Sequence, residues 1–211
     1  MHVTHVVSRP GVWLGWIIAN AAGYAIGFAL WQAVYAEIRL TLRLPISGIA
    51  LLAGFGATVG PCAGLAQAVA LRYSAARAGI WVLAAAAGCV AGFIVAAGVG
   101  GALSDALEPR VGIPLTDAAV VLLFGAVLGA GIGGARWLLL HAGGLPTARW
   151  TLASVVGMMI GYPLAIGVLE LLPELDQPVV GLAFGVCAGA TTALIEWLVA
   201  RNDIITAWRV S

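Results

Sequence analysis

Long apolar segments alternate along this chain with short segments that carry proline and charge. Six apolar segments of 22 to 26 residues run over 12–36, 46–71, 78–103, 118–140, 150–172 and 179–200. They are separated by helix breakers, namely Pro45, Pro109 with Pro114, Pro146, and Pro173 with Pro178. An α-helix of this length crosses the roughly 30 Å hydrocarbon core of a bilayer. The pattern therefore predicts six transmembrane helices.

Small residues recur within these segments at helical spacing. The second, fourth and sixth segments share a small-xxx-small-xxx-small-xx-polar pattern: Gly56, Gly60, Gly64 and Gln67; Gly125, Gly129, Gly133 and Arg136; Gly185, Gly189, Ala193 and Glu196. The first, third and fifth share Trp-x6-Gly-x3-Gly: Trp16, Gly23 and Gly27; Trp81, Gly88 and Gly92; Trp150, Gly157 and Gly161. This spacing places each set on one side of a helix. Because glycine lets two backbones approach closely, we expect these faces to be helix–helix contacts.

The two patterns alternate, so the chain is expected to be an internal repeat of helical hairpins. The predicted units cover about 12–72, 78–141 and 150–201, and residues 202–211 are expected to form an interfacial tail on the cytoplasmic side. Each unit has two helices, so all three units share one orientation, as parallel repeats do. The predicted fold is an all-α membrane domain with pseudo-threefold symmetry. Two rings of three helices would be a natural arrangement, one from the odd segments and one from the even segments.

The arginines predict the orientation. With six spans both termini share a side, and that side holds six arginines against three on the other. The positive-inside rule then places both termini in the cytoplasm, in a bacterial inner membrane. Tryptophan favours the membrane interface, so Trp81, Trp150 and Trp208 are expected to lie at the cytoplasmic surface.

Composition agrees with a membrane protein and excludes several other classes. The chain is 62% hydrophobic and 9% charged, whereas soluble domains carry about 25% charged residues. The net charge of +1 provides no basic field for nucleic acid. The three cysteines, Cys62, Cys89 and Cys187, lie in apolar segments without metal-ligand spacing. Membrane lipids are the expected surroundings.

Gln67, Arg136 and Glu196 occupy the same position in the three copies of the repeat, and they are the main candidates for function. Polar groups inside a membrane are functional suspects by default. They could form a polar cluster around the axis that gates an ion or holds a head group. Alternatively, Arg136 and Glu196 could form a structural ion pair that Gln67 completes, which would fix the order of the repeats. A third possibility is that both charges reach separately to the nearby interface.

We found no pattern of catalytic residues in the sequence. There is no Ser/His/Asp grouping, no HExxH and no phosphate-binding loop, since Gly129, Gly131 and Gly133 lack a following Lys-Ser/Thr. None of the three histidines, His2, His5 and His141, lies in the middle of a predicted span, where it could hold a haem. We therefore predict neither an enzyme nor a cofactor nor a metal site.

The combination of Gly-x3-Gly, a polar residue, Leu-Arg, a short basic turn and Trp-x6-Gly-x3-Gly resembles a group of uncharacterised bacterial polytopic membrane proteins. These occur in cyanobacteria, Chloroflexi and actinobacteria, and their polar position is usually glutamine. Gln67 matches that position, while Arg136 and Glu196 depart from it. The resemblance implies the hairpin architecture and no activity.

These observations lead to two hypotheses about function. The first is a non-catalytic accessory or scaffold subunit of a larger membrane complex, such as an energy-converting one, whose partners are other membrane subunits. The alternative is a small transporter or channel with a polar constriction at Gln67, Arg136 and Glu196.

Overall fold

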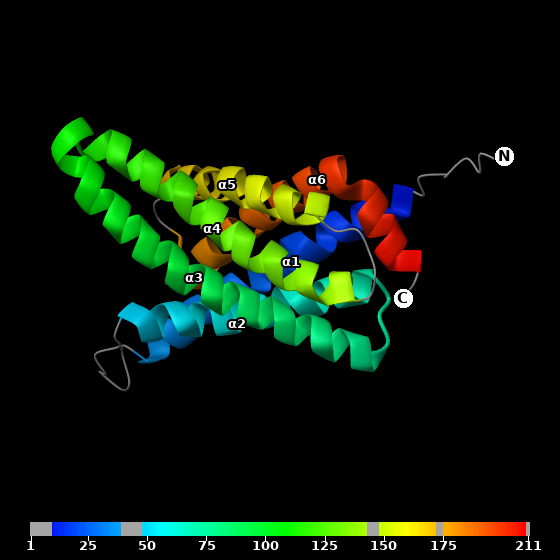
Figure 1. Cartoon of the computed structure of the whole chain (residues 1–211). Helices are drawn as coiled ribbons and strands as arrows, with labels where there is room; N and C mark the ends of the chain where they lie inside the picture. The colour runs from blue at the N-terminus through cyan, green and yellow to red at the C-terminus, as the bar shows by residue number, and fades with distance from the viewer. Residues whose placement is uncertain (1–9, 39–47, 143–147, 172–174, 210–211) are drawn as a thin grey trace.

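A computed structural model describes residues 10–38, 48–142, 148–171 and 175–209, and the described structure is all-helical (Figure 1). Its helices are α1 (Pro10–Glu37), α2 (Gly48–Ala70), α3 (Ala75–Val111), α4 (Ile113–Ala142), α5 (Ala148–Glu170) and α6 (Gln177–Arg209). All six are long and apolar enough to cross a membrane, as the sequence predicted. Helix α1 begins and helix α6 ends at the same end of the bundle, which is called here the terminal end.

The six helices form one closed ring. Each helix packs against its neighbours in the chain, and α6 closes the ring against α1. Among the described residues, helices that are not neighbours in this ring make no close backbone contact. The expectation of two rings of three helices was therefore wrong. The reason is that the glycine faces point sideways to the next helix, so odd and even helices alternate in a single ring.

Each helix presents a set of glycines to the next helix around the ring. A β-carbon added at Gly23 of α1 would lie 2.7 Å from Ala63 Cα of α2, and one at Gly60 of α2 would lie 2.6 Å from Ala86 Cα of α3. The pattern continues with Gly88 against Gly131, with Gly125, Gly129 and Gly133 against α5, with Gly157 and Gly161 against α6, and with Gly181, Gly185 and Gly189 against α1. At most of these positions the distance is below 3.0 Å, which real side-chain contacts essentially never show, while at Gly133 and Gly161 it is 3.0 Å, which leaves a β-carbon little room.

Helices α3 and α4 extend beyond the others at the far end from the termini (Figure 1). The sequence predicted that α3 would end near residue 103, but it continues through Pro109 to Val111. Gly112, with φ of 80°, is the one residue between α3 and α4. Pro114 then lies in the first turn of α4, where its missing N–H has no consequence. The chain therefore turns at Gly112 in a tight hairpin rather than in a long loop.

At the terminal end, α6 bends and covers the ring. Ala200 has non-helical angles (φ −118°, ψ 19°), and helix continues beyond it to Arg209. Ile204 in this last section is fully buried, in one cluster with Leu71 and Leu140. Leu71 and Leu140 each stand four residues after the polar residue of their helix, at Gln67 and Arg136, and the corresponding residue of α6 is alanine. Ile204 thus supplies the bulk that Ala200 lacks.

The outward surface of the ring is apolar. Leu83, Leu138 and Leu152 are among many large aliphatic side chains that are exposed in the isolated chain. In water such a surface would be unstable, whereas in a bilayer it faces lipid. The molecule thus has the polarity of an integral membrane protein.

The glycine contacts yield a test within one helix. Gly129→Ala should lower stability by about 1–3 kcal/mol, because its β-carbon would collide with the Ser154 and Val155 backbone. Gly134→Ala is the matched control, since a β-carbon there has no neighbour within 4 Å. Thermal unfolding in detergent should separate the two variants. Equal melting temperatures would contradict the tight α4–α5 contact.

The bend in α6 yields a second test. Ile204→Ala should cost about 2–5 kcal/mol, because it leaves a cavity over the terminal end of the core. Leu198→Ala, at an exposed position on the same helix, should change stability little. Denaturation in a detergent mixture would measure both. A mild effect at Ile204 would mean that the end of α6 does not seal the ring.

A candidate site in the ring: a polar layer and an aromatic collar

Three tryptophans meet inside the terminal end of the ring. Trp16, Trp81 and Trp150 are 1%, 3% and 1% exposed. The rings of Trp16 and Trp150 pack edge-to-face with centroids 5.3 Å apart, and Trp81 lies 5.9 Å from Trp150. The sequence predicted Trp81 and Trp150 at the membrane interface, whereas the structure buries both rings inside the bundle. Their indole rings are buried in the bundle, where the N–H of Trp81 has a polar partner, Gln67, on the adjacent helix. The side chain of Trp208 lies outside the described residues.

Gln67 forms one buried hydrogen-bonded group with its neighbours on either side. Its amide nitrogen donates to Asn20 Oδ1 at 2.7 Å, and its amide oxygen accepts from Trp81 Nε1 at 3.2 Å. Asn20 in turn donates to the Trp16 carbonyl at 2.9 Å. Gln67 therefore ties α2 to both α1 and α3. The expectation that Gln67 would complete an Arg136–Glu196 pair is replaced by this separate group.

Arg136 and Glu196 form an ion pair in the interior of the ring. Arg136 Nη1 lies 2.6 Å from Glu196 Oε1, and the two side chains are 3% and 0% exposed. Of the possibilities raised by the sequence, the two side chains form a buried pair and do not extend separately to the interface. Isolated buried charges cost several kcal/mol, and pairing offsets much of that cost.

Glu196 also holds two further donors. It accepts from Trp16 Nε1 at 3.0 Å and from the Ser154 hydroxyl at 2.7 Å. Ser154 lies 3.0 Å from the Trp150 carbonyl as well, and its single proton can serve one acceptor at a time. Arg136 Nη1 also reaches Ser154 Oγ, at 3.4 Å. Glu196 therefore joins α6 to α1, α4 and α5.

Two buried donors in this layer have no acceptor: Trp150 Nε1 and Arg136 Nε. Comparison with the other two tryptophans explains why Trp150 Nε1 has no acceptor. Trp81 finds Gln67 on the preceding helix, and Trp16 finds Glu196. Arg136 holds the corresponding position before Trp150, and a guanidinium has no acceptor. Arginine at this position thus leaves the third indole without its partner.

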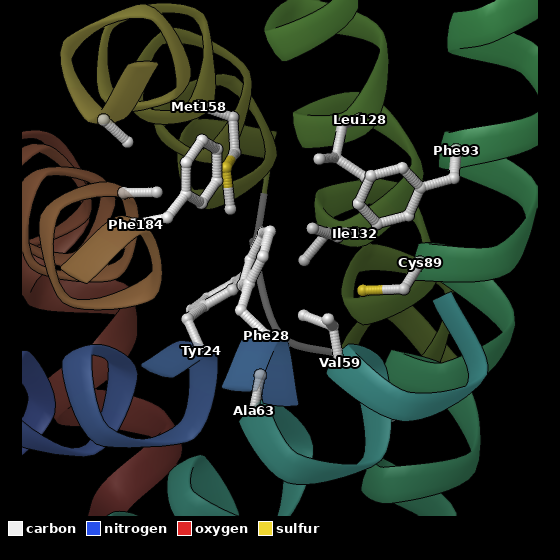
Figure 2. Close-up of a cluster of buried hydrophobic side chains, with 12 residues drawn as sticks. Tyr24, Phe28, Val59, Ala63, Cys89, Phe93, Leu128, Ile132, Met158 and Phe184 are labelled. Carbon is white, nitrogen blue, oxygen red and sulfur yellow. The ribbon is translucent and has the colours of Figure 1, made fainter. Parts of the chain in front are cut away.

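A collar of six aromatic residues surrounds the axis on the far side of the polar layer. Each helix provides one: Phe28, Phe55, Phe93, Phe124, Tyr162 and Phe184. Successive ring centroids lie 4.5 to 5.8 Å apart, and Phe184 returns to Phe28 at 4.6 Å, which closes the circle. Figure 2 shows Phe28, Phe93 and Phe184 turned into the ring, with Met158 and Leu128 among them.

Sequence reasoning missed this collar, although a signal was present. Each aromatic residue stands 12 positions from its reference residue, after the tryptophan in the odd helices and before the polar residue in the even ones. For example, Phe28 follows Trp16 by 12, and Phe55 precedes Gln67 by 12. The glycine pattern masked it, because the two sets interleave on the same helices.

The remaining sequence candidates lie apart from this layer. His141 stacks on Trp137 with ring centroids 5.0 Å apart, at an exposed position. Cys62 packs toward α1 near Gly27, and Cys89 is buried in the apolar core. Within the described ranges, no group of three or more His, Cys, Asp or Glu residues could hold a metal ion.

One ionisable group stands at the terminal edge of the site, outside the helices. Tyr73, in the turn between α2 and α3, packs edge-on to Trp81 with centroids 5.4 Å apart. Burial raises the pKa of Tyr73, and the positive charge of Arg77 partly opposes that shift. The phenol is therefore neutral, and it packs against the buried cluster that contains the three tryptophans.

Comparison of the chain with protein-family models, with curated proteins and with solved structures found no match. The resemblance drawn from the sequence motifs thus stays a prediction.

The ion pair can be tested by removing one charge and then both. Arg136→Ala should destabilise the protein by about 3–5 kcal/mol, because Glu196 would remain buried and uncompensated. Arg136→Gln combined with Glu196→Gln should recover most of that loss, since each glutamine gives the next tryptophan an acceptor. Unfolding in detergent would measure the set. Mild, additive single variants would show that the charges do not interact.

Proposed function

We propose that this protein is a non-catalytic integral membrane subunit that acts as an accessory or scaffold within a larger membrane complex. The observation that carries the proposal is the filled interior. Four levels follow one another along the axis: the end of α6 with Ile204, the tryptophan cluster, the polar layer and the aromatic collar. Their side chains are mostly buried. Interior groups bonded mainly to each other stabilise the ring, and the outer surface is left to meet partners.

The projecting hairpin of α3 and α4 supports this proposal. Helix α3 has 37 residues, a length of about 55 Å, whereas crossing the hydrocarbon core takes about 30 Å. At the tip of the hairpin, Ile113 and Leu115 of α4 are 60% and 65% exposed, and the acids Glu108 and Asp117 nearby in the chain are exposed as well. Apolar side chains that stand beyond a bilayer on an extended hairpin are suited to contact another protein.

We further propose that the three hairpins are related by a pseudo-threefold axis along the membrane normal. Gly56, Gly125 and Gly185 pack against Val90, Met159 and Ala25, respectively. Each of these partners stands nine residues after the tryptophan of its own helix, at Trp81, Trp150 and Trp16. Equivalent contacts at equivalent positions support rotation of one unit onto the next. The proposed setting is a bacterial inner membrane with cytoplasmic termini, on the arginine distribution.

A small channel or transporter is the second candidate, and the collar above the ion pair favours it. A closed circle of aromatic side chains on the axis of a helical ring, next to a charged layer, has the order of a hydrophobic gate and a polar constriction. In this alternative the observed structure is the closed state, and Gln67, Arg136 and Glu196 form the constriction.

Reconstitution separates the two candidates. Purified wild-type protein in liposomes should give no more flux of ions or small solutes than empty liposomes do, under either sign of membrane potential. As a control, the double variant Phe93→Ala with Phe124→Ala removes two neighbouring rings of the collar. Its flux should exceed that of empty liposomes only if ions or solutes can pass along the axis. Wild-type flux that the Arg136→Gln, Glu196→Gln variant abolishes would favour the channel and contradict the scaffold.

The complex itself can be tested in native membranes. We expect the chain, extracted in mild detergent, to migrate on native gels well above its own 21.4 kDa mass with its detergent belt. Ile113→Ser with Leu115→Ser should release it as a single folded chain, because these side chains lie outside the ring core. Leu138→Ser with Leu152→Ser, on the outward face of the ring, is the matched control. A wild-type protein that migrates alone would contradict the proposal.

A further inference from the structure

The two unpaired donors of the polar layer point to a bound molecule. Trp150 and Arg136 are 1% and 3% exposed, and neither Trp150 Nε1 nor Arg136 Nε has a partner. Buried N–H groups in native proteins are nearly always satisfied, since each one left unpaired is costly. Two such groups within one connected layer are therefore unlike the rest of this core, where Asn20, Gln67, Ser154 and Glu196 all have partners.

The two donors lie in one neighbourhood. Arg136 reaches Ser154, which is one helical turn beyond Trp150 on α5 and contacts its carbonyl. The Arg136 guanidinium also lies 6.0 Å from the centre of the Trp16 ring, and Trp16 packs against Trp150. Arg136 and Trp150 thus share Ser154 and Trp16 as neighbours. The third tryptophan position accordingly has two donors where the other two positions have one donor and one acceptor.

The charge of the layer restricts what can bind there. The positive charge of Arg136 is already balanced by Glu196 at 2.6 Å. An added anion would leave a net negative charge in an apolar interior, and such charges are expensive. A neutral molecule that accepts two hydrogen bonds fits without that cost. Water accepts two hydrogen bonds and donates two, so it can satisfy both N–H groups without adding charge.

We propose that one water molecule is bound between Arg136 Nε and Trp150 Nε1, where it takes the place of the acceptor that Gln67 gives Trp81 and Glu196 gives Trp16. Buried waters typically make about three hydrogen bonds to groups that would otherwise be unsatisfied. This site does not depend on the proposed scaffold role, because it follows from the interior alone.

Vibrational spectroscopy of the full chain in nanodiscs tests the site. The difference between wild type and Trp150→Phe isolates the Trp150 indole, whose N–H marker band should have the hydrogen-bonded frequency. The same difference spectrum should contain a water O–H band that shifts in heavy-oxygen water. Trp81→Phe is the matched control: its indole band should also be hydrogen-bonded, but no heavy-oxygen shift should accompany it. A free indole N–H at Trp150, or a bonded one without a water band, would overturn the proposal.

A second variant keeps the test decisive if Trp150→Phe does not fold. Arg136→Gln with Glu196→Gln supplies an amide oxygen to Trp150 and should displace the water, so the shifting band should be lost while Trp150 stays hydrogen-bonded. Persistence of the band would overturn the site. For the wild type, an experimental density map that shows ordered water should contain a peak within hydrogen-bond distance of both nitrogens, and an empty map there would equally refute it.

Discussion

Close approach of helix backbones is the constraint on which this structure depends. In a bilayer, apolar side chains gain little by leaving lipid, so helices associate through packing and hydrogen bonds. Gly60 and Gly129 let α2 and α4 lie directly on the backbones of α3 and α5, and Gly185 does the same for α6 on α1. Because every helix makes this contact in the same direction around the ring, the last one closes on the first.

The ring in turn determines what the axis must contain. Six closely spaced helices enclose a space that lipid cannot enter, so side chains have to fill it at the density of a protein core. One aromatic residue from each helix fills one level, and three tryptophans fill another. A substitution at one level then requires compensation nearby. Ala200 stands where the other even helices have Leu71 and Leu140, and the bend there carries Ile204 into the gap.

Much of the fold could be predicted from the sequence, and the errors have physical causes. Length and hydropathy were sufficient for the six helices, and glycine spacing for their contact faces. The single ring could not be predicted, because spacing shows which face packs without showing which neighbour it meets. The interfacial preference of tryptophan did not predict that the rings of Trp81 and Trp150 are buried inside the bundle, where Gln67 accepts from the Trp81 indole.

At the candidate site, the sequence identified Gln67, Arg136 and Glu196 but not how their roles divide. Equivalent positions suggested one cluster of three. The geometry separates them because Gln67 and Glu196 accept from Trp81 and Trp16, whereas a guanidinium has no acceptor for Trp150. The collar went unnoticed for a different reason: its residues are ordinary apolar ones, and their meaning appears only when six segments are brought around one axis.

Three different residues, Gln67, Arg136 and Glu196, hold the same position of the sequence pattern, and this difference favours one order of the helices around the ring. Glycine faces alone would allow any even helix to pack on any odd one. Gln67 requires Asn20 on one side and Trp81 on the other, while Glu196 requires Trp16 and a positive charge. A hairpin in the wrong place would bury Arg136 or Glu196 without its partner, at a cost of several kcal/mol. The polar layer thus distinguishes helix pairs that the glycine contacts alone would not. It makes closure of α6 on α1 of the same chain the arrangement in which the buried charges are matched.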